Sequence, residues 1–419
     1  MAKKMIIALI VWVPSVFLLT VPSANILHSQ QTRTFTVNPL RLDLRILGHP
    51  PLDVIPPDES AITSLVIGAD GCLYGGTSGK RAHLFVLDPA WNHVFPLGHL
   101  PGEVSIYHSL VAAPDGSILI GTSLPNQSRV DERHRDILTR YKNYPGGHIY
   151  KFDPKKERES RIRMQRPDPD RPLPFVTDLG IAVSGEGIAC LVIGEGELYG
   201  VTVPNGHFFV TNLKTGKTKD IGKICGPPLN EEPFRSIPHC LLTDTKGRVW
   251  GAGDYGALFH YAPGSQKIVH HPGLRLPSEL GREFKTIIDA MVLGPDGLIY
   301  GGTSDGYIFR FDPEARKIAN LGKPIWQYRI RGLAFSQDGD LYGVGGEPGG
   351  AVRLFVYRTT EGCYENLGLL DVNRTPYYAW LAYEADSMVT GNDGTIFIGE
   401  TGRIAHLYIL YPWKKTKGK

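Results

Sequence analysis

The sequence has little cysteine and no excess of charge of either sign. Its 419 residues include only 5 cysteines, an odd number with no Cys-x-x-Cys pair, so neither a disulfide framework nor a zinc-finger-like site is indicated. The 45 Lys and Arg residues nearly balance the 42 Asp and Glu residues, for a formal charge of +3. No basic excess therefore indicates a nucleic-acid partner. One disulfide bond is possible, but the sequence does not indicate which two cysteines would form it. The five cysteines are Cys72, Cys190, Cys225, Cys240 and Cys363.

Long hydrophobic runs are also absent, except at the N-terminus. Residues 1–23 hold two early lysines, an apolar run, and Val21 and Ser23 at a spacing that suits cleavage. This pattern predicts a secretory signal peptide. An uncleaved anchor is the alternative, because the run is nearly long enough to span a bilayer of about 30 Å. We expect an exported protein, periplasmic or extracellular, that touches a membrane only through an uncleaved segment. Residues 24–34 read as a lead-in and 414–419 as a basic tail.

What the sequence does have is an internal repeat. An apolar strand, an x-Asp-Gly turn, a strand ending Tyr-Gly-x-Thr, a strand reading x-Leu-Phe-x-x-Asp-Pro and a strand ending Leu-Gly recur along the chain. Most intervals between repeats suit a four-stranded propeller blade, and the long second interval indicates insertions in blade 2. The turn glycines of the seven copies are Gly71, Gly116, Gly196, Gly247, Gly297, Gly339 and Gly394.

This repeat predicts an all-β fold, a seven-bladed β-propeller of four-stranded blades over residues 35–413. Asp-Gly favours a type I′ hairpin turn, and no stretch has the pattern of a long amphipathic helix. In six of the seven repeats, the third strand is followed in the sequence by a fourth strand. The missing one is predicted at residues 40–48, where an N-terminal strand completes the last blade and removes the exposed sheet edges. We expect a single-domain monomer.

Aligned first strands place one position of each blade just inside the loop-rich mouth of the ring. Five of the seven residues there are ionisable, and an alanine between the two histidines predicts an open gap. Asp289, Arg331 and Asp386 can form a structural staple of ion pairs, and the histidines can be structural or catalytic. Two histidines without a clear third ligand do not suit a closed zinc site, so no metal or cofactor is predicted. The seven positions are Thr63, His108, Ala189, His239, Asp289, Arg331 and Asp386.

The predicted loops around this mouth are rich in cations and aromatic rings. Aromatic faces suit stacking, and arginine binds carboxylates bidentately, so we expect an acidic oligosaccharide or polysaccharide as partner. The alternative is that these aromatics hold the loops together. Tyr141 and Tyr144, in an insertion, are predicted either to fold over the mouth as a partial lid or to lie in a solvated excursion. The binding candidates are Lys80, Arg81, Tyr107, Arg235, Tyr255, Lys285, Tyr328, Arg329, Tyr377 and Tyr378, with Arg282, Trp326 and Trp380 in the same loops.

The stretch LGPDGLIYGGTSDGYIFRFDPEARKIANLG resembles the blade unit of secreted bacterial propellers, the streptogramin-lyase-like and ulvan-lyase-like proteins. The resemblance covers nearly the whole mature chain at the level of the blade. It implies a lyase in which His, Asn or Arg neutralises a carboxylate and a Tyr or His acts as base.

Three functions follow from these residues. The first is β-elimination on an acidic carbohydrate, with His108 as base, His239 as second member, and Arg331 or Arg329 neutralising the carboxylate. The second is hydrolysis by a pair of carboxylates, Asp289 and Asp386. The third is a non-catalytic propeller that binds a ligand or serves as a protein-interaction scaffold.

Overall fold

The computed structural model describes residues 38–41, 55–88, 93–125, 134–161, 168–225, 236–346, 350–374, 378–402 and 405–412. Residues 34–419 form one compact unit. The predicted signal peptide, lead-in and basic tail lie outside the described residues.

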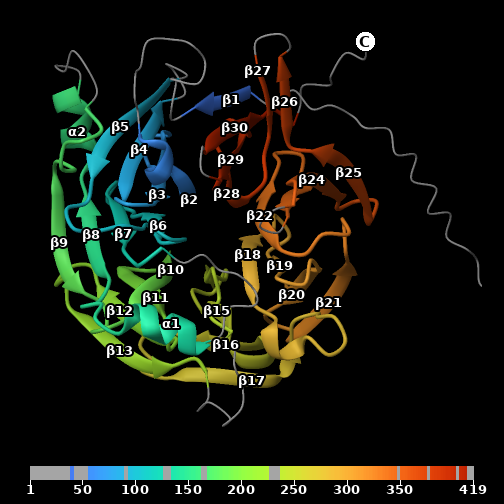
Figure 1. Ribbon diagram of the computed structural model, residues 1–419. Helices are drawn as coiled ribbons and strands as arrows, with labels where there is room; N and C mark the ends of the chain where they lie inside the picture. Colours follow the sequence, from blue (N-terminus) through green and yellow to red (C-terminus); the bar gives the residue numbers. More distant parts are fainter. Residues whose placement is uncertain are drawn as a thin grey trace, which may run out of the picture. The chain divides into compact units, whose positions relative to one another are not determined.

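Within the described residues, seven four-stranded antiparallel sheets form the blades (Figure 1). Blade 1 holds β2 (Ala61–Ile67), β3 (Leu73–Ser78), β4 (His83–Asp88) and β5 (His93–His99). Blade 2 holds β6 (Leu110–Ala112), β7 (Ile118–Gly121), β8 (His148–Phe152) and β9 (Val176–Ile181). Blade 3 holds β10 (Gly187–Ile193), β11 (Glu197–Val203), β12 (His207–Asn212) and β13 (Thr218–Lys223). Blade 4 holds β14 (Leu242–Thr243), β15 (Val249–Ala252), β16 (Ala257–Tyr261) and β17 (Ile268–Arg275).

The remaining blades follow the same order from the innermost strand outward. Blade 5 holds β18 (Ile288–Leu293), β19 (Ile299–Thr303), β20 (Ile308–Asp312) and β21 (Lys317–Gly322). Blade 6 holds β22 (Ile330–Phe335), β23 (Leu341–Gly345), β24 (Arg353–Arg358) and β25 (Cys363–Leu369). Blade 7 holds β28 (Ala385–Thr390), β29 (Ile396–Glu400), β30 (His406–Leu410) and β1 (Asn38–Arg41). A hairpin of β26 (Asp371–Arg374) and β27 (Tyr378–Leu381) links blades 6 and 7.

The ring closes as the sequence predicts. The innermost strand of each blade contacts that of the next blade, and β28 contacts β2. The N-terminal strand β1 pairs with β30, from Asn38 opposite Ile409 to Arg41 opposite His406. It begins two residues earlier than predicted, and 42–50 lie outside the described residues. The seven-bladed propeller with an N-terminal closing strand is confirmed.

The predicted type I′ geometry of the Asp-Gly turns is wrong. Gly71 has a φ of 77°, whereas Asp70 is not among the non-glycine residues with positive φ. The Gly71 N–H donates to the Gly68 carbonyl, as in a type I turn followed by a left-handed glycine. The Asp70 carboxylate accepts from the Cys72 N–H (3.1 Å) and the Tyr74 hydroxyl (2.8 Å). The aspartate therefore caps the turn, and only the glycine takes the left-handed conformation.

The first glycine of the Tyr-Gly repeat makes room for an aromatic ring. In β19, Gly301 lies opposite Phe309 of β20, and a Cβ on Gly301 would lie 2.2 Å from the Phe309 ring. The same Gly–Phe pairing recurs in blades 1, 3, 4 and 6. Blades 2 and 7 have isoleucine at this position, and there the partner is tyrosine. Gly302, the next residue, makes room for Ile330 of blade 6, so it serves the contact between blades.

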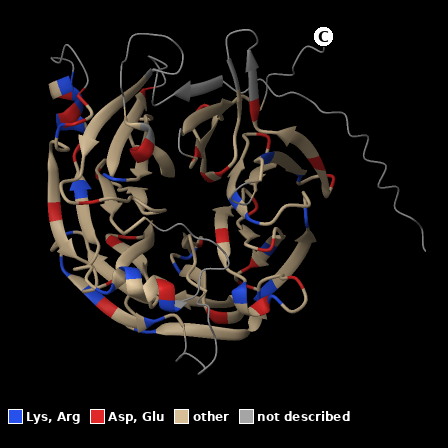
Figure 2. Cartoon of the chain, viewed as in Figure 1, with Lys and Arg blue, Asp and Glu red and all other residues tan. Residues whose placement is uncertain are grey.

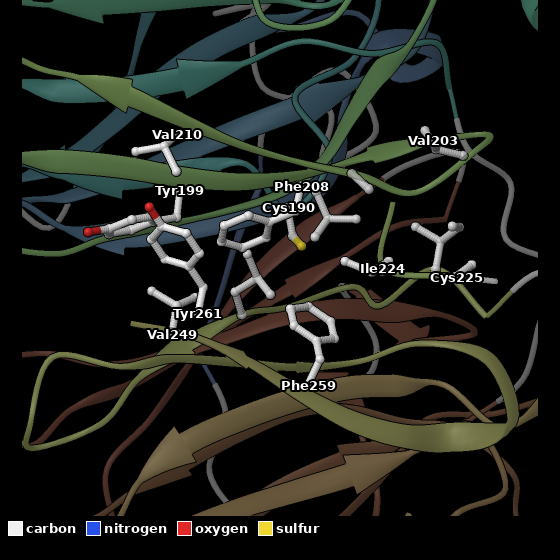
Figure 3. Close-up of a cluster of buried hydrophobic side chains, with 14 of the residues drawn as sticks. Cys190, Tyr199, Val203, Phe208, Val210, Ile224, Cys225, Val249, Phe259 and Tyr261 are labelled. Atoms are coloured by element: carbon white, nitrogen blue, oxygen red, sulfur yellow. The ribbon is translucent and has the colours of Figure 1, made fainter. Parts of the chain in front are cut away.

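The hydrophobic core lies largely between neighbouring blades. Figure 3 shows the cluster between blades 3 and 4, in which Tyr199 and Phe208 of blade 3 face Phe259 and Tyr261 of blade 4. Cys190 is buried among these side chains, and all five cysteines are free thiols. The disulfide that the sequence left open is not formed.

The insertions of blade 2 carry two short helices, α1 (His134–Tyr141) and α2 (Pro154–Arg161). Short 3-10 turns lie at Pro57–Glu59, Asp254–Gly256 and Glu283–Lys285. Tyr141 is buried, and its hydroxyl lies 2.8 Å from Ser123 Oγ. Tyr141 belongs to the core cluster of blades 3 and 4, and Tyr144, partly buried, packs against it. A solvated excursion is therefore wrong for these two residues, and the partial lid stays a prediction. Over the described part of the chain, no helix has the length and apolar character needed to cross a membrane.

Candidate functional site

Five of the seven aligned positions share a local irregularity of the backbone. In blades 1, 3, 5, 6 and 7, the pairing of the first two strands skips one residue. The skipped residue is a β-bulge, which leaves the ladder and aims its side chain differently from its neighbours. The two histidines precede β6 and β14, at the equivalent position of their blades. The bulged residues are Thr63, Ala189, Asp289, Arg331 and Asp386.

The two histidines contact each other directly. The His108 and His239 rings stack with centroids 5.1 Å apart and an interplanar angle of 13°. They belong to blades 2 and 4, and Ala189 of blade 3 is fully buried. The predicted gap is therefore wrong, because the larger side chains on either side meet across the alanine. Tyr107 packs edge-on against both rings, and its Oη lies 3.4 Å from His239 Nε2.

A buried ion pair between Arg329 and Asp289 contacts Nδ1 of His239. Arg329 Nε donates to Asp289 Oδ2 and Arg329 Nη2 donates to Asp289 Oδ1, both at 2.6 Å. His239 Nδ1 lies 3.0 Å from Asp289 Oδ1 and 3.3 Å from Arg329 Nη2. All three side chains are buried, Arg329 completely.

The predicted staple of Asp289, Arg331 and Asp386 has a different composition. Asp289 pairs with Arg329 as above, and Arg331 Nη1 lies 2.6 Å from Asp386 Oδ1. The structure therefore has two separate arginine–aspartate pairs, Arg329–Asp289 and Arg331–Asp386, where the sequence predicted one ion-pair network of three residues. Their four charges sum to zero, which satisfies the requirement that buried charges be compensated.

Burial and the paired charges determine the ionisation of this cluster. For Asp289, burial alone would raise the pKa, but Arg329, His239 and Arg331 outweigh it and lower the pKa. Burial lowers the pKa of His239, an effect that Asp289 opposes and that Arg329 and Arg331 reinforce. Burial, followed by His239 and Arg331, holds the pKa of His108 well below its ordinary value. Both imidazoles are therefore neutral at pH 7.

His108 is less buried than Tyr107, His239, Asp289 and Arg329. Its side chain is partly exposed, and its Nε2 is buried without a hydrogen-bond partner. Its φ of 42° and the φ of 65° at Arg329 both lie in the left-handed region. Such conformations cost about 1–3 kcal/mol each in non-glycine residues and gather at functional sites. Two of them in one cluster favour a functional role over a purely structural one.

Several of the predicted binding residues already contact neighbouring charged or aromatic side chains. The Tyr328 ring has Arg282 at 4.8 Å and Lys323 at 4.7 Å from its centroid, and its hydroxyl donates to Glu279. This ring is therefore a poor platform for a sugar. Similar neighbours lie beside Tyr255, which has Arg275 over its ring, and beside Lys285, which lies over Phe284.

The remaining candidates do not join the central cluster. Lys80 pairs with Asp58, and Arg81 bridges Glu59 and Asp170 at 2.9 and 2.6 Å. Arg235 and Tyr377 lie outside the described residues, and the backbone of Tyr378 begins β27. Trp326, in the connection between blades 5 and 6, is 76% exposed. Its ring is therefore an aromatic surface that a ligand can reach.

Sequence reasoning missed two contacts. It assigned Tyr107 and Arg329 to the loops as ligand contacts, whereas both are buried against His239. Arg329 and Arg331 lie on either side of Ile330, a residue of the hydrophobic core, and this spacing is the sequence signal that sets both arginines apart from the apolar cluster. Among the described residues, no three His, Cys, Asp or Glu side chains are grouped so as to hold a metal ion. Figure 2 shows acidic and basic residues interspersed over the blades.

Comparison with protein-family models gives no match, and no curated protein matches. Solved structures match in fold. A streptogramin B lyase aligns over 90% of this chain and 97% of its own, with a TM-score of 0.57 and 11% identity. A catalytically inactive virginiamycin B lyase from Staphylococcus aureus, solved with quinupristin, aligns over 90% and 100%, with a TM-score of 0.58 and 10% identity.

A second group of matches consists of domains of larger proteins. The extracellular domain of a hybrid two-component system from B. thetaiotaomicron aligns over 84% of this chain and 38% of its own, with a TM-score of 0.54 and 14% identity. At these identities the likeness concerns the fold alone. The chain is a seven-bladed β-propeller that resembles the streptogramin-lyase propellers.

Proposed function

We propose that this protein is an exported lyase that binds an acidic carbohydrate at the mouth of the ring and cleaves it by β-elimination. The observation that carries the proposal is His108, a neutral and partly exposed residue whose imidazole Nε2 is buried and has no hydrogen-bond partner. A neutral imidazole with an available lone pair is a general base.

The proposed reaction removes a proton from the carbon next to the substrate carboxylate. The proton moves to His108 Nε2, its electron pair forms the new carbon–carbon double bond, and the bond to the leaving oxygen breaks. The leaving oxygen takes a proton from solvent. The carbanion character of this step requires a positive charge near the carboxylate, and Arg331 is one of the cations that face His108.

Hydrolysis by Asp289 and Asp386 has less support. A glycosidase of the usual kind needs one protonated carboxyl as general acid. Asp289 binds Arg329 through both oxygens and has a lowered pKa, so it stays ionised. Asp386 is also paired with an arginine.

A ligand-binding propeller without catalysis is the second candidate. It is favoured by His239, Asp289 and Arg329, which are nearly completely buried and bind one another. On this alternative, Trp326 and His108 contact the ligand and the buried ion pairs only stabilise the ring.

The test is the ultraviolet absorbance of unsaturated uronates during incubation with a panel of uronic-acid polysaccharides. Wild type is compared with His108→Ala and with His148→Ala, a matched control on β8 of the same blade. We expect product with wild type and the control, and none with His108→Ala at unchanged circular dichroism. Equal product from all three proteins, or none from any, contradicts the proposed lyase. Binding without product would favour the second candidate.

A further inference from the structure

Four side chains form a continuous chain of polar contacts from the Tyr107 hydroxyl to Arg329. Tyr107 Oη lies 3.4 Å from His239 Nε2, and His239 Nδ1 lies 3.0 Å from Asp289 Oδ1. Arg329 then binds both oxygens of Asp289 at 2.6 Å. Tyr107 belongs to blade 2, His239 to blade 4, Asp289 to blade 5 and Arg329 to the entry of blade 6, so only the closed ring brings them together.

The position of the imidazole proton follows from the two neighbours of Nδ1. Asp289 can only accept a hydrogen bond, and Arg329 can only donate one. The carboxylate oxygen is closer, at 3.0 Å against 3.3 Å for Arg329 Nη2, and it is an anion. The proton therefore lies on Nδ1. Nε2 then has a lone pair, which accepts the Tyr107 hydroxyl hydrogen.

Burial disfavours the charged form of His239, and Arg329 acts in the same direction. The groups that face this imidazole are Asp289, Arg329, Arg331, His108 and Tyr107. Asp289 beside an imidazole favours the cation, and Arg329 counters this by compensating the aspartate. Without Arg329, one cation, Arg331, would face two aspartates, and it is already paired with Asp386.

The backbone at Arg329 favours a functional role for this residue. Arg329 is fully buried and has a φ of 65°, a conformation that glycine adopts without strain and that a long side chain rarely adopts. A long charged side chain at such a position favours a functional role for its charge.

We propose that Arg329 is a positioning residue that keeps His239 neutral with its proton on Nδ1, so that Nε2 accepts the hydrogen of Tyr107. His239 then orients Tyr107 and contacts no substrate. The inference deepens the proposed function, because it fixes the Tyr107 ring that packs against His108, the proposed base, and it rests on that function for the role of Tyr107 alone. The state of His239 is measurable without a substrate, so the two proposals can fail separately.

The experiment is nitrogen-15 NMR of imidazole-labelled protein, which distinguishes the two neutral tautomers and the cation of each histidine. The His239 signals are assigned with His239→Gln. Wild type should show neutral His239 with a protonated Nδ1 at pH 7. Arg329→Met should show a cationic His239 at pH 7, because Asp289 loses its compensating charge. Arg329→Lys should restore the neutral form, because it restores the charge.

Two further variants keep the inference falsifiable. Arg329→Met with Asp289→Asn removes both charges, so it leaves no uncompensated buried charge that would oppose folding. It should show neutral His239 with both tautomers populated. Arg358→Met is the matched control, because Arg358 of blade 6 also binds two carboxylates, Asp340 and Glu365, away from the histidines. It should leave the His239 signals unchanged. A protonated Nε2 in wild type, a neutral His239 in Arg329→Met, or a single Nδ1–H tautomer in the double variant would overturn the inference.

Discussion

Gly302 connects the packing of the blades to the candidate site. A Cβ at this position would lie 2.4 Å from both Cβ and Cγ2 of Ile330, the first residue of β22. Ile330 is fully buried and stands between Arg329 and Arg331. The atom that would be struck is a Cβ fixed by the backbone, so a change of rotamer cannot relieve the clash. We therefore predict that Gly302→Ala displaces the start of β22 and with it both arginine–aspartate pairs.

The magnitude follows from two opposing effects. Overpacking a buried contact costs about 1–3 kcal/mol, whereas replacing glycine stabilises a protein by about 0.4–1 kcal/mol through the unfolded state. Gly273→Ala is the matched control, because a Cβ there would meet no atom within 4 Å. The free energy of unfolding of Gly302→Ala should therefore lie about 1–3 kcal/mol below that of Gly273→Ala.

Urea denaturation followed by tryptophan fluorescence measures this difference, provided that both variants give the same slope with denaturant. The His239 NMR signals provide a second reading, because they should shift in Gly302→Ala and stay unchanged in Gly273→Ala. Equal unfolding midpoints for the two variants would refute the reasoning, since the ring would then absorb a Cβ where the structure leaves no space. A loss of stability without a change at His239 would refute the link to the site.

Three further predictions concern other parts of the molecule. Burial, followed by the neighbouring His271, lowers the pKa of His260 to about 4. Between pH 6.5 and about 4 the unfolded chain therefore binds a proton at His260 that the folded protein does not bind. The free energy of unfolding should fall as the pH falls through this range. His260→Gln should make this fall shallower in urea midpoints measured at pH 7.5, 5.5 and 4.5, and an unchanged slope would contradict the assignment. A thiol reagent should label Cys363, the exposed cysteine, rapidly in native protein and all five thiols in guanidinium; fewer than five would indicate a disulfide. Trp326→Ala should leave the unfolding midpoint unchanged because the side chain is 76% exposed, while weakening retention on a uronic-acid polysaccharide column; full retention would exclude Trp326 from the binding surface.

The amino-acid sequence determined the fold because each blade repeats the same local chemistry. The Asp-Gly turns, the alternation of apolar residues and the missing fourth strand are local or countable features, and together they require a closed ring of seven. The equivalence of His108 and His239 followed from the same repeat. The turn type was mispredicted because both residues of Asp-Gly tolerate positive φ, whereas in the structure Asp70 is held as a cap by Tyr74.

Only the tertiary structure decided which charged groups meet. Sequence alignment placed Asp289, Arg331 and Asp386 in consecutive blades, but the pairing depends on side-chain reach across the ring and on bulges that shift the register by one residue. Arg329 lies outside the aligned position, yet its left-handed backbone directs its guanidinium to Asp289. The stacking of His108 on His239 likewise depends on the small size of Ala189 and on the curvature of three successive blades. Such contacts join residues far apart in the chain, so they arise only when the ring has closed.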